Sequence, residues 1–165
     1  MAWRYCAPMV MAGALALIAT PCAAKGRATN QFRVTTTVVS GCTVSATPMV
    51  FFVPVPANID VSSTSTLTLR CSPNVAYAID IDAGLNPQGA TGRRVANAAK
   101  TQFLNYDIFK DPPHSQVWGR GNLKNVAGIS GATGLAVYTV YGLLNARSTM
   151  TAGGYRDTLT ITVTF

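Results

Sequence analysis

Residues 155–165, with the sequence YRDTLTITVTF, show the fold class of this chain most clearly. Apolar and threonine side chains alternate there, and the apolar set is Leu159, Ile161, Val163 and Phe165. A period of two places alternate side chains on opposite faces of an extended chain. The stretch therefore predicts a β-strand with one buried face and one solvated face.

The remainder of the sequence shows further strand-like segments between turn signals, and no stretch has a sustained helical period. Strands are predicted at residues 66–71, 75–82, 103–109 and 135–144, where Thr, Val, Ile and Tyr are frequent. An apolar run at 42–55 is broken by prolines, and glycine-rich loops are predicted at 84–92 and 119–134. About seven or eight strands without a second domain indicate an all-β sandwich or barrel.

Residues 1–24 have the features of a secretory signal peptide. A positive charge is followed by a short uncharged apolar stretch at 9–18 and by small residues up to Ala24. Cleavage there would leave two of the four cysteines, Cys42 and Cys71. In an exported protein two remaining cysteines suggest one disulfide, and two unpaired buried thiols are the alternative.

The charge of the chain is strongly positive, with thirteen Lys and Arg, six aspartates and a formal net charge of +7. The basic residues are scattered singly, apart from Arg93 and Arg94, and they are not interleaved with aromatic residues. This pattern predicts a weak affinity for anionic surfaces and no nucleic-acid partner.

A strand is also predicted at residues 31–39, with the sequence QFRVTTTVV. The side chains that share its more apolar face are Phe32, Val34, Thr36 and Val38. Nine extended residues span about 30 Å. The two residues that separate this strand from Cys42 leave little room to turn it back across its own domain.

The strand at 155–165 is expected to have an edge without a partner strand, because no later segment of this sequence can pair with it. Natural proteins rarely leave such an edge bare. We therefore predict a donor strand within residues 25–41, an acceptor edge at 159–165, and a head-to-tail polymer in which each donor fills its neighbour's gap. The alternative is that 31–39 is the first strand of a self-contained sandwich.

Motifs spread over residues 42–165 carry a resemblance to a known family. They are LRCSP at 69–73 with Tyr77, DAG at 82–84, RR at 93–94, LNY at 104–106 with Asp111, VWGRG at 117–121, VYG at 140–142 and AGGYRDT at 152–158. In their order and spacing the sequence resembles the spore coat protein U domain family, which includes subunits of archaic chaperone–usher pili. Residues 48–56 depart from the family pattern, since they contain three prolines and lack an expected glycine and tyrosine.

The resemblance implies an incomplete immunoglobulin-like sandwich over residues 42–165, lacking its last strand and closed by a Cys42–Cys71 disulfide. A periplasmic chaperone would lend the missing strand during export, and at an outer-membrane usher the N-terminal strand of the next subunit would replace it. The expected product is a cell-surface fimbrium for adhesion and biofilm formation. The alternatives are a secreted spore-coat or matrix protein of the same fold without an usher, and an outer-membrane β-barrel, which also has alternating strands.

The sequence predicts no catalytic, metal-binding or cofactor site. Asp80 and Asp82 share a strand face, but the alternation places them toward solvent, where neither pKa would be raised for acid–base work. His114, the only histidine, lies in a proline-rich loop and suggests no Ser–His–Asp arrangement. Trp118 is expected to be a core or rim anchor, with sugar stacking as the alternative. We expect an assembly protein, not an enzyme.

Overall fold

The computed structural model describes residues 31–54, 58–121, 123–147 and 149–165. The predicted signal peptide and residues 25–30 of the predicted donor segment lie outside this part of the chain. Two compact units are distinguished, Met1–Thr37 and Val38–Phe165. The described residues of the first unit, 31–37, are exposed and form no strand.

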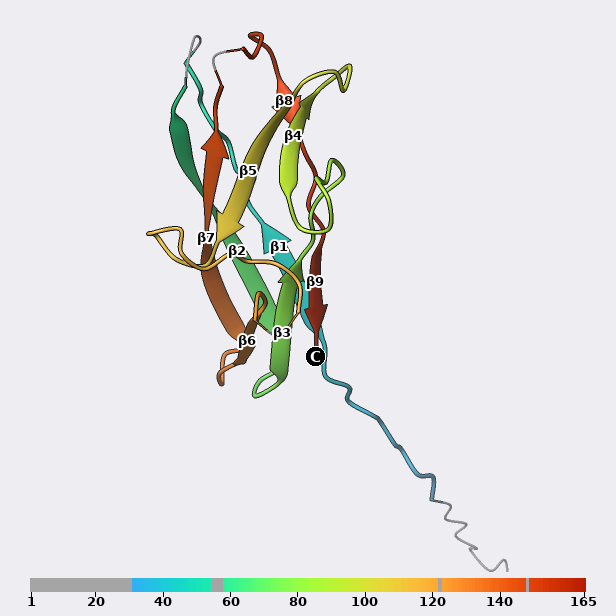
Figure 1. Ribbon diagram of the computed structural model, residues 1–165. Coiled ribbons are helices and arrows are strands. Elements are labelled where there is room, and N and C mark those ends of the chain that lie inside the picture. Colours follow the sequence, from blue (N-terminus) through green and yellow to red (C-terminus); the bar gives the residue numbers. More distant parts are fainter. Residues whose placement is uncertain (1–30, 55–57, 122, 148) are drawn as a thin grey trace, which may run out of the picture. The chain divides into compact units, whose positions relative to one another are not determined.

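The described part of the second unit contains nine β-strands and no helix (Figure 1). The strands are β1 (Cys42–Ala46), β2 (Asp60–Cys71), β3 (Ala76–Ile81), β4 (Arg93–Asn97), β5 (Phe103–Phe109), β6 (Val126–Ile129), β7 (Leu135–Asn145), β8 (Tyr155–Arg156) and β9 (Ile161–Thr164). One sheet has the order β1-β2-β7-β5-β4-β8, the other has the order β6-β3-β9, and all pairings are antiparallel. The predicted all-β sandwich is confirmed, with nine strands instead of seven or eight.

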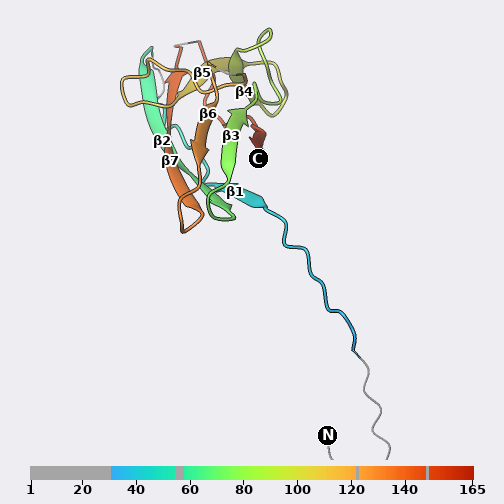
Figure 2. The ribbon, with the colours of Figure 1, turned by 90° about the horizontal axis from the view of Figure 1, so that it is seen from below.

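The two sheets enclose one apolar core, and Figure 2 shows β3 and β6 beside β2 and β7. The buried side chains are those on alternate positions of the strands, as a period of two requires. Those in the core cluster include Leu67, Leu69, Tyr77, Ile79, Ile81, Leu104, Tyr106, Ile108, Val140 and Leu144. Trp118 is 1% exposed and donates a hydrogen bond from Nε1 to the carbonyl of Ile79, 3.1 Å away. It is therefore a core anchor, as expected.

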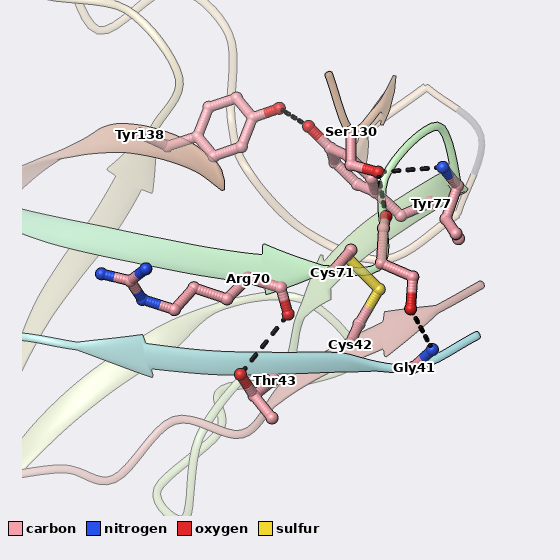
Figure 3. Close-up of a disulfide and its surroundings, with 10 residues drawn as sticks. Gly41, Cys42, Thr43, Arg70, Cys71, Tyr77, Ser130 and Tyr138 are labelled. Atoms are coloured by element: carbon pink, nitrogen blue, oxygen red, sulfur yellow. Dashed lines mark hydrogen bonds between the residues drawn. A yellow bond between two sulfur atoms is a disulfide. The ribbon is translucent and has the colours of Figure 1, made fainter. Parts of the chain in front are cut away.

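The predicted disulfide joins Cys42 to Cys71, which lie directly opposite each other on β1 and β2 (Figure 3). The residue before β1 is held as well, since the Gly41 amide donates to Ser72 Oγ at 3.1 Å and the Ser72 amide donates to the Gly41 carbonyl at 2.8 Å. The disulfide and these bonds fix the beginning of β1 against β2.

The strand predictions differ from the structure at several places, and β4, Arg93–Asn97, lies in no predicted strand. Residues 31–39 form no strand, because a strand needs a hydrogen-bonded neighbour and none of the described strands pairs with them. β2 begins at Asp60, in a Ser- and Thr-rich run that lacks clear alternation. β6 lies within the predicted loop at 119–134, where its glycine obscured the strand pattern. The single strand predicted at 155–165 is divided between the two sheets, as β8 and β9.

Candidate functional site

The edge of β9 is open in the described structure. β9 pairs on one side with β3, where Ile161 lies opposite Ile81, and no described strand pairs with its other side. Just before β9, the Thr160 carbonyl accepts a hydrogen bond from the Asp82 amide at 3.1 Å. The edge of β9 that faces away from β3 therefore has backbone amide and carbonyl groups available to a further strand.

Across from β9 lies β1, the edge strand of the larger sheet, which runs in the opposite direction (Figure 1). The chain continues from β1 as residues 47–53, which we call the strap. The Thr47 amide donates to the Thr66 carbonyl at 2.9 Å, and Ser65 Oγ and Ser63 Oγ of β2 donate to strap carbonyls at 2.5 and 2.7 Å. Pro48 has no amide hydrogen to continue a regular ladder. Serine side chains thus replace part of the strand pairing.

The side chains of the strap alternate although it is not a regular strand. Met49, Phe51 and Val53 are half-buried, whereas Val50 is 52% exposed and Phe52 is 84% exposed. The ring of Phe51 lies 6.2 Å from the ring of the core residue Tyr106. One face of the strap therefore belongs to the core.

Between the strap and residues 155–161 the core opens into a groove of about 860 Å³. Its floor consists of apolar core side chains from both sheets, and its two sides carry the inward side chains of the strap and of the last strand. The floor residues are Ile81, Val95, Leu104, Tyr106, Ile108, Val140 and Leu144. An apolar groove beside an unpaired strand edge can take up the alternate side chains of an added β-strand.

Asp157 fixes the point where the chain crosses from β8 to β9. Its Oδ1 accepts hydrogen bonds from the Leu85 amide at 2.9 Å and from the amide and side chain of Asn86, while its Oδ2 accepts from the Tyr106 hydroxyl at 2.7 Å. Gly84 has a φ of +78°, and a side chain there would overlap Asp157. Burial and the hydrogen bond to Asp157 raise the pKa of Tyr106 far above its usual range, so its hydroxyl remains a donor.

Asp80 and Asp82 do not face solvent freely, contrary to the prediction. Both are half-buried, and Asp80 Oδ1 accepts a hydrogen bond from the Gly121 amide at 2.9 Å. Asp82 Oδ1 accepts from the amides of Gly84 and Thr160 at 3.0 and 2.8 Å. The two carboxylates hold loops beside β9, and they have no arrangement that suggests acid–base chemistry.

The pKa of Asp82 gives a prediction about acid stability. Burial alone would raise this pKa, but hydrogen bonds from Thr160 and Gly84 and the charge of Arg120 lower it below the ordinary value of 3.8. Asp82 therefore stabilises the fold above the unfolded-state pKa of about 4, and this contribution is lost as the pH falls through the lower folded-state value. We expect Asp82→Asn to reduce the dependence of the unfolding temperature on pH between about 4 and 2.

The control for that measurement is Asp60→Asn, at the exposed start of β2. Thermal unfolding of both variants and the wild type, followed by circular dichroism, gives the comparison. An Asp82→Asn protein whose unfolding temperature falls with acid as steeply as that of the wild type would contradict the assignment.

Of the residues predicted to form the acceptor edge, Leu159 and Ile161 line the groove. Leu159, Ile161 and Val163 are half-buried against the core, and Phe165 is 57% exposed. The predicted donor side chains are exposed, with values of 88% for Phe32, 79% for Val34 and 91% for Val38, and Thr36 is exposed too. Their roles as acceptor and donor remain predictions.

The strap was not predicted to be part of the site. The alternation in MVFFV at residues 49–53 was the available signal, but the flanking prolines made the run look broken. Within the described residues, no three His, Cys, Asp or Glu side chains are grouped to hold a metal ion. The same part of the chain has no helix long and apolar enough to cross a membrane.

Comparison with known proteins assigns the family. Residues 28–162 match the model of the Spore Coat Protein U domain. The chain belongs to this family. The resemblance noted in the sequence is confirmed, and the open sandwich is therefore the structure of a Spore Coat Protein U domain.

Two individual relatives agree with this assignment. Protein U of Myxococcus xanthus is 30% identical over 113 residues, which cover 65% of this chain and 62% of that protein. A crystal structure of the CsuC–CsuE chaperone–tip adhesion subunit pre-assembly complex, from archaic chaperone–usher Csu pili of Acinetobacter baumannii, matches with a TM-score of 0.61 and 28% identity. That match covers 78% of this chain and 41% of the other, so this Spore Coat Protein U domain chain spans less than two thirds of each relative.

Proposed function

We propose that this chain is a structural subunit of a chaperone–usher pilus and that it has no catalytic role. The observation that carries the proposal is the apolar groove between the strap and residues 155–161, which lies beside the unpaired edge of β9. The similar CsuC–CsuE structure is a pre-assembly complex of a chaperone with a pilus subunit, which supports this class of assembly. The fibre would be exported through the periplasm to the cell surface, where it would serve adhesion and biofilm formation.

The strand that fills the groove in the fibre would be residues 31–39 of a neighbouring copy. The three large apolar side chains on one of its faces, Phe32, Val34 and Val38, are exposed, so all three are available for burial. Each contributes about 1.5–3 kcal/mol when fully buried. Each backbone hydrogen bond to the groove edges adds roughly 1 kcal/mol. A nine-residue strand is about 30 Å long.

Each subunit would thus accept one strand and donate another. Such a head-to-tail contact does not close on itself, so repetition produces a filament. Before assembly a periplasmic chaperone would occupy the groove with a strand of its own, and an outer-membrane usher would exchange that strand for the donor. β1 and β9 run in opposite directions, so an inserted strand would be parallel to one of them and antiparallel to the other.

Disulfide trapping tests whether the donor comes from another molecule. With Val34→Cys and Ile161→Cys in one chain, we expect oxidation to give a ladder of covalent oligomers on a non-reducing gel. Val34→Cys with Val137→Cys is the matched control, because Val137 is 58% exposed on the outer face of β7, away from the groove. Crosslinks confined to single chains would show that the arm folds back onto its own domain.

A spore-coat or matrix role without an usher is the second candidate, favoured by the similarity to Protein U of Myxococcus xanthus. The two candidates differ in their route to the surface. Deleting the usher genes of the native organism should leave the subunit in the periplasm if it is a pilin. Undiminished surface delivery in that strain would favour the coat or matrix role.

A further inference from the structure

The floor of the groove has a recess at Gly142. The inward positions of β7 are 136, 138, 140, 142 and 144, and only 142 has no side chain. The space above it is occupied by two strap side chains. A methyl group at position 142 would overlap Met49 Sδ and would lie 2.8 Å from Phe51 Cζ and 3.1 Å from Met49 Cε.

The backbone conformation does not explain this glycine. Gly142 lies inside a regular strand, paired with Ser63 of β2 and Ile108 of β5, and its φ is not positive. Alanine adopts that conformation readily, and glycine inside a strand costs about 0.5–1 kcal/mol relative to alanine. The missing side chain is therefore explained by the space that Met49 and Phe51 take up.

We propose that Gly142 keeps the groove open for the incoming strand by giving Met49 and Phe51 a place to lie against the floor. This inference rests on the function proposed above and assigns a positioning residue to the same site. Met49 and Phe51 both line the groove, and Gly142 lies beneath them in the larger sheet. The β7 backbone closes the space below, so a side chain at 142 would displace the flexible end of Met49 into the open groove.

Phe51 has less freedom than Met49 to give way. Its ring is rigid and tilted against the ring of Tyr106, with 6.2 Å between their centres. Met49 has a flexible unbranched side chain, which adapts to irregular spaces. We therefore expect Met49 to be the residue that moves when position 142 is enlarged, and its removal should relieve the effect.

The test measures, by anisotropy, the affinity of a fluorescent peptide with the sequence of residues 31–39 for the exported chain without residues 25–39. This chain has no donor strand that could fill the groove of another copy, and every variant is made in this background. We expect the wild type to bind and Gly142→Ala to bind about tenfold more weakly or worse, the size expected for an overfilled site. Adding Met49→Ala to Gly142→Ala should recover most of the loss. Gly131→Ala is the matched control, because a side chain there would meet no atom within 4 Å.

Three results would overturn the inference. They are unchanged binding by Gly142→Ala, no recovery in the double variant, and an equal loss in Gly131→Ala. Thermal unfolding shows whether Gly142→Ala folds. If it does not, Met49→Phe overfills the recess from the side of the strap and should also weaken peptide binding. A Met49→Phe protein with wild-type affinity would then refute the inference. A wild-type protein that does not bind the peptide would overturn the donor-strand function itself, and the inference with it.

Discussion

Deleting residues 25–39 should abolish polymerisation while leaving the sandwich folded and its groove able to bind a strand. The deletion removes the exposed apolar side chains of Phe32, Val34 and Val38, which would contribute about 1.5–3 kcal/mol each on burial in a neighbour. It retains Gly41, whose amide donates to Ser72 Oγ and whose carbonyl accepts from the Ser72 amide, so that the beginning of β1 stays held. The shortened chain can accept a donor but cannot provide one.

Electron microscopy and size-exclusion chromatography of the purified proteins measure this effect. Full-length subunits should form fibres, and the shortened subunit should remain monomeric and stop fibre growth when mixed with the wild type. A chain of full length with Phe32→Ser, Val34→Ser and Val38→Ser is the matched control for length, and it should behave like the deletion. Fibres formed by the shortened chain alone would show that residues 31–39 are not the donor.

Replacing Arg93 by methionine should cost the fold about 3–5 kcal/mol, the range seen when one partner of a buried charged network is removed. Arg93 lies on β4 and is 3% exposed. Its guanidinium donates to the carbonyls of Ile81, Asp82 and Trp118 at 3.1, 2.9 and 2.8 Å, and it pairs with Asp107 at 2.5 Å. This single side chain therefore ties the larger sheet to the end of β3 in the smaller one.

Urea unfolding with the disulfide intact measures the loss. Arg93→Lys should fall between the wild type and Arg93→Met, because an ammonium group has fewer donors and no planar fork. Arg94→Met is the matched control: Arg94 donates to the loop carbonyls of Asn86 and Pro87 and covers the ring of Phe103, so a change below about 1 kcal/mol is expected. An Arg93→Met protein as stable as the control would contradict the role given to this arginine.

The N-terminal strand and the contacts of Arg93 and Asp157 have separate roles in the subunit. Arg93 and Asp157 hold the sheets and the β8–β9 crossing in place, so that the open side of the sandwich keeps its groove. The N-terminal strand is proposed to fill that groove in the next molecule. A subunit that lost either the N-terminal strand or the contacts of Arg93 would fail to assemble. Only the loss of Arg93 would also lower the stability of the isolated domain.

The local pattern predicted several parts of this structure well. The strand at Phe103–Phe109 has the predicted bounds, and the strand predicted at 75–82 contains β3. The division of 155–165 between two sheets was missed because its inward side chains keep the same period across the crossing. The crossing is set by Asp157, whose hydrogen-bond partners Leu85 and Tyr106 are remote in sequence.

The sequence by itself determined that the chain is all-β and that residues 155–165 have one apolar face. These properties depend on residue type and on a period of two, which a strand shows without knowledge of its neighbours. Only the tertiary structure decided that the strap and residues 155–161 border a groove, and that Gly142 accommodates Met49 and Phe51. Those contacts join segments about a hundred residues apart, and no local pattern specifies the width of the space between them.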